Sequence, residues 1–235
     1  CKILVTSGKR DMMNEAFRVF RTNLDLMFGK KNSSRVIMLT SFNPNAGKTF
    51  TTMNIAASMA LKGSKVLLMD LDLRKATLSK ALSINSSGVA SYLNGKVDDY
   101  HLNIEKLEDN LFVIPVGSLP PNPAELLLTD RFKSMVASMR EEYDYIFIDC
   151  PPIDIVADAS IIADVVDMTV FVMRANIMDR RILPLVDELY RSGKYKHMAL
   201  VLNGVDTYHK QYGYGRYGYG YGYGYGYGYG YGNQD

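Results

Sequence analysis

This chain of 235 residues has little of several features that would restrict its class. It has two cysteines, Cys1 and Cys150, and no tryptophan. Two cysteines do not make a disulfide framework, so the composition fits a reducing cytosol. No apolar run approaches the roughly 20 residues that a transmembrane helix needs. The formal net charge is only +2, which gives no reason to expect nucleic acid as a partner.

The N-terminus also lacks the pattern of a signal peptide, and the chain begins at Cys1 rather than at a methionine. We therefore expect a fragment, namely the cytoplasmic part of a longer protein. Hydrophobic residues make up 47% of the sequence, which is ordinary for a globular protein. This length is enough for one large α/β domain with a substantial core.

Short apolar runs alternate with helical stretches along the chain, which predicts a mostly parallel sheet with helices on both faces. The runs are continuous rather than alternating, as expected for strands that are buried on both sides. The predicted strands are Val36–Leu39, Val66–Met69, Leu111–Ile114, Tyr145–Ile148, Val170–Met173 and Met198–Leu202.

Helices are predicted between these strands from their end signals. One runs from Lys48 to Leu61 and stops before Gly63, and another covers 179–191. A third begins at Asn122-Pro123, with the asparagine as cap. A helix near residues 12–28 places one apolar stripe along a single face, made of Phe17, Phe20, Leu24 and Met27.

The composition changes completely at Tyr212, where tyrosine and glycine begin to alternate up to Gly232 with one interruption at Arg216. Glycine is costly to order, and this segment has no aliphatic face to bury. We therefore predict a folded domain over residues 1–207 and a disordered tail over residues 208–235.

The strongest motif is the segment from Ser41 to Thr49, which follows an apolar strand and opens a helix. This is the context of a phosphate-binding P-loop, in which backbone N–H groups at the helix start cradle phosphate oxygens. Lys48 would reach the β- and γ-phosphates, and Thr49 would place its hydroxyl on Mg²⁺. Phe42 stands where the first glycine of the strict pattern belongs.

Carboxylates follow two further predicted strands. Asp70 and Asp72 come after the run at 66–69, and Asp149 follows the run at 145–148. Carboxylates at this edge of a parallel sheet can hold Mg²⁺ or accept a proton from an attacking hydroxyl. Cys150 has no evident histidine partner in the sequence, so we expect it to be a small buried residue. The order of the three motifs predicts a nucleotide site in a P-loop NTPase-like fold.

The sequence resembles the bacterial tyrosine kinases of capsule and exopolysaccharide assembly. The matching segments are the loop at 44–49, Asp70-x-Asp72-x-Arg74, and Asp149-x-Pro151-Pro152. Glu15-x-x-Arg18-x-x-Arg21 looks like the family's subunit-contact motif, and a C-terminal tyrosine cluster completes the set. The resemblance covers essentially the whole chain.

The resemblance implies a protein-tyrosine kinase that uses ATP and Mg²⁺. Lys48, Asp70 and Asp72 would be catalytic, with Asp70 orienting or deprotonating the attacking tyrosine hydroxyl. Metal ligands would be Thr49, Asp72 and Asp149. The nucleotide would be bound by Asn45, Ala46, Gly47, Lys48, Thr49, Phe50 and, at the base, Asn203.

The resemblance also implies an assembly at the inner face of the bacterial cell membrane. The segment 1–30 would form ring oligomers through Glu15, Arg18 and Arg21. A membrane-embedded adaptor, fused upstream or separate, would activate the kinase, a tyrosine phosphatase would reset it, and the cycle would regulate polysaccharide polymerisation and export. The phosphoacceptors would be Tyr212, Tyr214, Tyr217, Tyr219, Tyr221, Tyr223, Tyr225, Tyr227, Tyr229 and Tyr231.

Two other functions remain open from the sequence. One is a partitioning or division-site ATPase of the same fold class, although those proteins typically have a lysine where this chain has Asn43. The other is a non-catalytic scaffold with a self-associating Gly-Tyr tail. The charged spacing at 15–21 could also be a solvated helix face, and Asn203 could be a strand-end cap. His101, His197 and His209 have no metal-ligand spacing.

Overall fold

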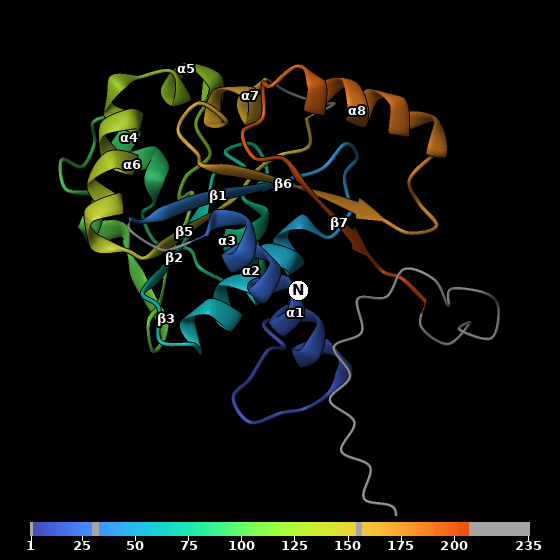
Figure 1. The fold of residues 1–235 in the computed structure, drawn as a ribbon. Coiled ribbons are helices and arrows are strands. Elements are labelled where there is room, and N and C mark those ends of the chain that lie inside the picture. The colour runs from blue at the N-terminus through green and yellow to red at the C-terminus, as the bar shows by residue number, and fades with distance from the viewer. Residues whose placement is uncertain (1, 30–32, 154–156, 207–235) are drawn as a thin grey trace, which may run out of the picture. The chain divides into compact units, whose positions relative to one another are not determined.

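The computed structural model describes residues 2–29, 33–153 and 157–206, and its centre is one seven-stranded sheet (Figure 1). The strand order is β3-β4-β2-β5-β1-β6-β7. All neighbouring strands pair in parallel except β3 and β4, which are antiparallel. The strands are β1 (Arg35–Thr40), β2 (Val66–Asp70), β3 (Glu105–Glu108), β4 (Leu111–Ile114), β5 (Tyr145–Asp149), β6 (Met168–Arg174) and β7 (Ala199–Asn203).

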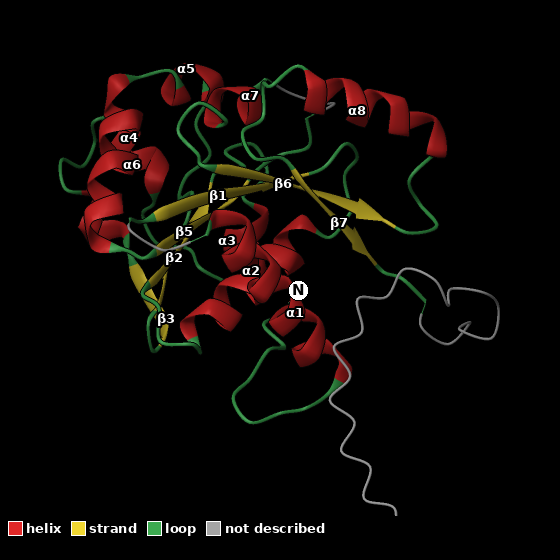
Figure 2. Ribbon diagram, viewed as in Figure 1, coloured by secondary structure: helices red, strands yellow, loops and turns green. Residues whose placement is uncertain are grey.

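Helices cover both faces of this sheet, with α1 to α3 on one side and α4 to α8 on the other (Figure 2). Two separate apolar clusters result, one containing Met53 and Ile55 of α2, the other Phe132 and Met135 of α6. The α-helices are α1 (Met12–Phe28), α2 (Lys48–Ala60), α3 (Thr77–Ala81), α4 (Val89–Leu93), α5 (Pro123–Leu127), α6 (Asp130–Glu142), α7 (Asp158–Ile162) and α8 (Leu183–Arg191), with 3₁₀ turns η1 (Tyr100–Asn103) and η2 (Arg180–Ile182).

The predicted fold class is confirmed, and the six predicted strands are found to within two residues at each end. The prediction of strands buried on both faces is wrong for β7. Its residues alternate between partly buried and exposed, and Leu200 and Leu202 are 50% and 58% exposed. The reason is position, because β7 is the last strand of the sheet and pairs only with β6 in the described structure. Strand β3 was missed because its residues, Glu105–Glu108, are mostly charged.

The predicted helices differ from the structure mainly at their ends. Helix α1 has the predicted bounds, but only part of its stripe is buried: Phe17 and Leu24 are enclosed, whereas Met27 is 49% exposed. The segment predicted as one helix over 179–191 begins instead as the 3₁₀ turn η2 and continues as α8. Asn122 precedes α5 as predicted, but its side chain makes no capping hydrogen bond.

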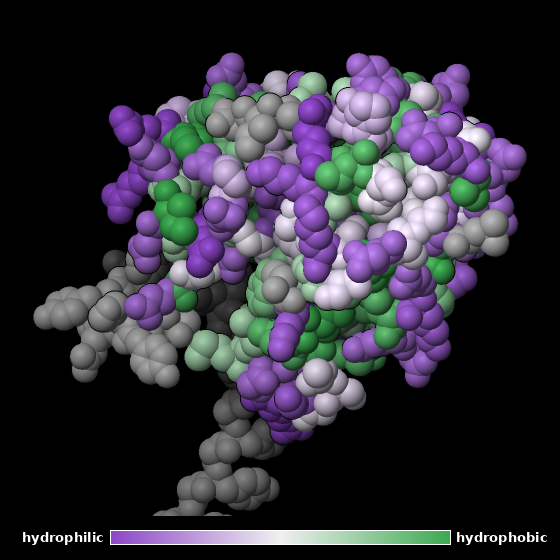
Figure 3. Space-filling view, turned by 180° about the vertical axis from the view of Figure 1, so that it is seen from behind, coloured by the Kyte–Doolittle hydropathy of each residue, from purple (hydrophilic) through white to green (hydrophobic). Residues whose placement is uncertain are grey.

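The described residues up to Gly204 form one compact unit. The predicted tail (208–235), its ten phosphoacceptor tyrosines and His209 lie outside the described residues. No helix in the described ranges is long and apolar enough to cross a membrane. The face in Figure 3 carries hydrophilic residues with apolar residues between them.

Candidate nucleotide site

The P-loop connects the buried strand β1 to helix α2. Its backbone turns through the left-handed region twice, at Asn45 (φ 63°) and at Gly47 (φ 95°). Phe42 needs no such conformation, because its own φ angle is not positive. Its side chain is 4% exposed and packs against Phe171 of β6, with ring centroids 5.6 Å apart. The position of the missing glycine is therefore a packing position in this chain.

Gly47 is required by two independent constraints. Its φ of 95° disfavours any side chain, and a Cβ atom there would lie 2.1 Å from Nδ2 of Asn203. That same Nδ2 donates a hydrogen bond of 3.0 Å to the carbonyl of Ala46. The last strand of the sheet thus contacts the P-loop directly through Asn203.

Thr49 and Asp149 meet inside the structure, as the sequence motifs predict for two metal ligands. The Thr49 hydroxyl donates to Oδ2 of Asp149 at 2.7 Å. One helical turn later, the hydroxyl of Thr52 lies 3.4 Å from Oδ1 of the same carboxylate. Asp149 is 1% exposed. The arrangement places a hydroxyl and a carboxylate oxygen side by side, which suits a hard cation such as Mg²⁺.

Asp72 lies in a tight turn after β2. Its Oδ1 accepts from the backbone N–H of Lys75 at 3.1 Å, and its Oδ2 accepts from the Thr77 hydroxyl at 3.0 Å. The same turn is attached to α7 by Arg74, whose Nε and Nη2 donate to the two oxygens of Asp158 at 3.0 and 3.2 Å. Asp158 is fully buried, so Arg74 supplies the charge that its carboxylate needs.

Asp70 is fully buried, and both of its oxygens already accept hydrogen bonds. Oδ2 accepts from the Ser79 hydroxyl at 2.7 Å and from the Ser79 N–H at 2.8 Å, while Oδ1 accepts from the N–H of Asp72 at 3.1 Å. The Ser79 oxygen in turn accepts from the N–H of Val116 at 3.0 Å. Asp70 is therefore held behind the turn that carries Asp72.

Burial dominates the electrostatics of this site. It raises the pKa of Asp149 to about 7, with a further rise from the neighbouring Asp70 carboxylate. It raises the pKa of Asp70 to about 6, against the hydrogen bonds from Ser79. Burial also lowers the pKa of Lys48, although Asp149 and Asp72 favour its charged form. Two buried carboxylates and one partly desolvated lysine favour the binding of further positive charge, which a divalent cation would supply.

Lys48, Asp72 and Asp149 line a cleft of about 580 Å³, within the usual range for small-molecule sites. Asp70 and Ala46 are not among its lining residues, and the described residues contain no group of three or more His, Cys, Asp or Glu able to hold a metal. A Mg²⁺ ion here would need phosphate oxygens and water as further ligands. The predicted site residues that do line the cleft are Asn45, Gly47, Lys48, Thr49, Phe50, Asp72, Asp149 and Asn203.

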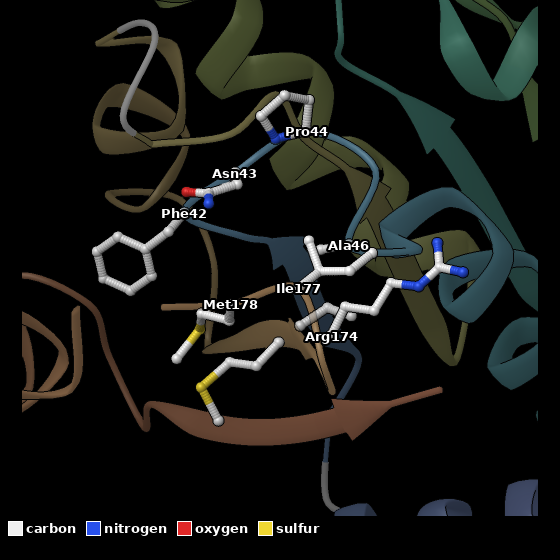
Figure 4. A pocket seen from close by; sticks show the side chains of 9 residues that line it. Phe42, Asn43, Pro44, Ala46, Arg174, Ile177 and Met178 are labelled. Carbon is white, nitrogen blue, oxygen red and sulfur yellow. The ribbon is translucent and has the colours of Figure 1, made fainter. Parts of the chain in front are cut away.

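A second, small and mostly apolar pocket lies beside the P-loop (Figure 4). Phe42, Ala46, Ile177 and Met178 contribute apolar surface to it. In Figure 4 the guanidinium group of Arg174 lies away from the side chains of Phe42 and Met178. Ala46 thus belongs to the packing behind the loop. Cys150, predicted to be buried, is 1% exposed, and burial raises its thiol pKa well above the usual value.

The charged residues of α1 lie on a different part of the molecule. Arg18 pairs with Glu15, and their side chains are 40% and 53% exposed. Arg21 instead donates from Nη1 to the carbonyl of Ser58 on α2 at 2.6 Å. The motif is therefore divided between an exposed pair and a link within the chain, and its role in subunit contact stays a prediction.

The sequence interpretation missed four residues that the fold brings to this site. Thr52 could have been found, because it lies one helical turn after Thr49. Ser79, Asp158 and Arg174 had no signal in the sequence: Asp158 and Arg174 lie far along the chain from their partners, and Ser79 belongs to the short helix α3. They matter through contacts with Asp70, Arg74 and the P-loop respectively.

Comparison with known proteins gives consistent findings. Residues 34–171 match the model of the AAA domain family. The chain is 35% identical over 206 residues to "Tyrosine-protein kinase CpsD" of Streptococcus agalactiae, covering 86% of this chain and 89% of that protein. It is 32% identical to "Tyrosine-protein kinase wzc" of Salmonella typhimurium, covering 92% of this chain but only 30% of that longer protein.

Among solved structures, the kinase domain of the Escherichia coli tyrosine kinase ETK superposes on this chain with a TM-score of 0.80. The two are 29% identical, and the match covers 96% of this chain and 86% of that domain.

Proposed function

This chain belongs to the bacterial tyrosine kinases and is a protein-tyrosine kinase, and we propose that it transfers the γ-phosphoryl group of ATP to tyrosines of its own C-terminal segment in a neighbouring subunit. The observation that carries the proposal is the cleft in which Lys48, Thr49 and Asp149 converge at the N-terminus of α2. The sequence supplies the acceptors, because 11 of its 17 tyrosines occur from Tyr208 onward.

The P-loop residues would hold the phosphates. Helix α2 begins at the cleft, so its first N–H groups are available to a ligand there. The N-terminus of a helix favours an anion such as a phosphate. Lys48 adds a positive charge that stabilises the phosphoryl group during transfer. The residues in this role are Asn45, Ala46, Gly47, Lys48, Thr49 and Phe50, with Asn203 at the base.

Mg²⁺ would be held by Thr49, Asp149 and Asp72. When bound, the ion neutralises charge that develops on the β- and γ-phosphate oxygens. The donors fit this ion, since all are hard oxygens and Asp149 is buried without a full countercharge. Lys48 lies among the same carboxylates and would share the phosphate charge with the ion.

Asp70 is proposed to orient or deprotonate the tyrosine hydroxyl that attacks the phosphate. In the structure Ser79 occupies Oδ2 of Asp70 with two hydrogen bonds. Contact with a substrate hydroxyl therefore requires a movement of the turn around Asp72. If that turn stays closed during catalysis, Asp70 acts through the position of Asp72, whose N–H it accepts.

The proposed biological setting is the inner face of the bacterial cell membrane. Glu15, Arg18 and Arg21 would contact the next subunit of a ring, and a membrane-embedded adaptor would activate the kinase. The Salmonella relative is much longer than this chain, which supports a fused adaptor, whereas the Streptococcus relative is matched over 89% of its length, which supports a separate one. Each phosphate adds about −1.5 to −2 charges at neutral pH, so multiple phosphorylation of tails would loosen the ring. A tyrosine phosphatase would reset it, and polysaccharide polymerisation and export would follow this cycle.

The test mixes two full-length variants with Mg-ATP. One has Lys48→Met and carries the intact tail, and the other keeps the kinase site but has phenylalanine at the ten tail tyrosines (212–231). Mass spectrometry should find phosphate on the tail of the Lys48→Met chain, because only transfer between chains can place it there. ATP hydrolysis without phosphotyrosine would favour the partitioning-type ATPase instead. Phosphate confined to residues 1–207 would overturn the assignment of the tail as acceptor.

A further inference from the structure

Arg174 is a cationic residue of the cleft to which neither sequence motif nor family resemblance gives a role. It is the last residue of β6 and pairs in register with Asn203 of β7. Its Nη1 donates to the carbonyl of Asn45 at 3.0 Å, so the side chain extends from the sheet edge over the P-loop. Both Arg174 and Asn203 line the cleft and both are hydrogen-bonded to the loop.

The cleft has two chemically different sides. Thr49, Asp72 and Asp149 supply the hydroxyl and carboxylate oxygens that suit a metal ion and its phosphates. The residues that contact the loop at positions 45 and 46 are instead Arg174 and Asn203, followed by Gly204. None of the residues on this second side of the cleft carries a carboxylate. A nucleotide with its phosphates at the start of α2 would leave this second side for its base and ribose.

The guanidinium of Arg174 has capacity for a ligand. It has five N–H donors, of which the described structure uses one, on the Asn45 carbonyl. Within the described ranges Arg174 forms no ion pair, and its side chain is exposed. A planar cation of this kind stacks on aromatic rings as well as donating hydrogen bonds. The side of the cleft that it faces is the one without competing negative charge.

We propose that Arg174 holds the base of the nucleotide, with the face of its guanidinium on the heteroaromatic ring and Nη1 on the P-loop carbonyl. The inference deepens the proposed function, because it assumes that the cleft binds a nucleotide. Arg174 then contributes to nucleotide affinity, because one side chain contacts both the base and the P-loop. Asn203 lies beside it in the sheet and approaches the same loop one residue further along.

The experiment compares two ligands that differ only in the base and ribose. Mg-ATP and magnesium tripolyphosphate are titrated calorimetrically into the wild type, Arg174→Ala and Arg174→Lys. Loss of a cation–aromatic contact should weaken ATP binding roughly 3- to 30-fold in Arg174→Ala. Tripolyphosphate should bind with an affinity changed less than about twofold. Arg174→Lys should fall between the other two proteins, because lysine keeps the charge but not the planar group.

The control is Arg181→Ala, an exposed arginine of η2 that pairs with Asp179 outside the cleft. It should bind both ligands as the wild type does, and thermal unfolding without ligand verifies that each variant is folded. Equal weakening of both ligands in Arg174→Ala would overturn the base contact and assign Arg174 to the phosphates or the loop. Unchanged binding of both would also overturn it. A wild type that does not bind ATP would instead contradict the proposed function itself.

Discussion

The nucleotide cleft and the outer face of α1 are both rich in charge, and the fold treats them in opposite ways. Asp149 lines the cleft and Asp70 lies behind its lining; both are fully or almost fully buried, and both accept hydrogen bonds from this chain. On α1, Arg18 and Glu15 form an exposed pair that is worth little to stability. The charged groups of the first region are held in position by the protein before any ligand binds. Those of the second region are exposed and can contact another molecule.

The largest expected effect comes from removing charge inside the cleft. Lys48→Met should reduce autophosphorylation by about 10²-fold or more, because stabilisation of the transferring phosphoryl group is a dominant catalytic contribution. The fold should be unaffected, since the side chain faces the cleft. Phosphotyrosine blotting and thermal melting measure the two quantities, with the exposed Lys80→Met as control. Near wild-type phosphotyrosine in the Lys48 variant would remove it from the mechanism.

The next effect concerns a buried charge that depends on one partner. Arg74→Ala leaves the carboxylate of Asp158 buried without its two hydrogen bonds, which should cost roughly 1–3 kcal/mol in free energy of unfolding. Urea denaturation measures it, and Arg18→Ala on the exposed pair should change the free energy of unfolding by less than about 1 kcal/mol. The double variant with Asp158→Asn should lose less than the sum of the single losses. Equal effects at Arg74 and Arg18 would erase the contrast between the regions.

On α1, the stability effect should be small and the effect on assembly large. Replacing Arg18 and Arg21 with alanine should give monomers by light scattering. The free energy of unfolding should change by only about 1 kcal/mol, mainly through the lost Arg21 bond to Ser58. A matched double variant, Arg180→Ala with Arg181→Ala, removes two exposed arginines elsewhere. If the α1 variant assembles like this control, the solvated-face interpretation is correct.

The smallest expected effect on stability concerns the exposed cluster around His101. His101 contacts Glu142 at 2.8 Å and Asp99 at 2.6 Å, and its ring stacks on Tyr100. Hydrogen bonds to Glu142 and then Asp99 raise the pKa of His101. A raised pKa in the folded state means that the stabilisation is complete below the unfolded pKa and is lost as the pH rises through the folded one.

The wild type should therefore lose a little stability between pH 6 and pH 9, relative to a variant with His101→Gln. Urea midpoints at these pH values measure the difference, and His197→Gln, at another exposed histidine, is the control. The same pH slope in all three proteins would show that the cluster carries no net charge stabilisation.

Much of the fold could be predicted because continuous apolar runs in the sequence mark the buried strands of the sheet. The runs that became β1, β2, β5 and β6 are continuous in the sequence and buried in the structure. The pattern could not give β3, which is mostly charged, nor the one-sided burial of β7. Edge position depends on strand order, and strand order is not written in any single segment.

The site shows the same division. Thr49 and Asp149 could be paired in advance, because both belong to motifs at the carboxyl ends of neighbouring strands. The sequence could not show that Asp70 lies behind Asp72, since that depends on Ser79 in α3. It could not show that Phe42 replaces a glycine without strain either, because the reason is a contact with Phe171. Spacing predicts which groups meet, and packing decides which of them a ligand can reach.

The contact between Asn203 and the P-loop fixes the point from which the tyrosine-rich segment is tethered. Tyr208 follows Asn203 by five positions, so that tyrosine can lie at most about 18 Å away, whereas Tyr231 can reach about 100 Å. Effective concentration at a given distance falls as the tether lengthens. If phosphoryl transfer occurs between chains as proposed, the longer tether would let the late tyrosines reach more distant clefts than the early ones. Position along the segment would then determine how widely each proposed acceptor is shared between chains.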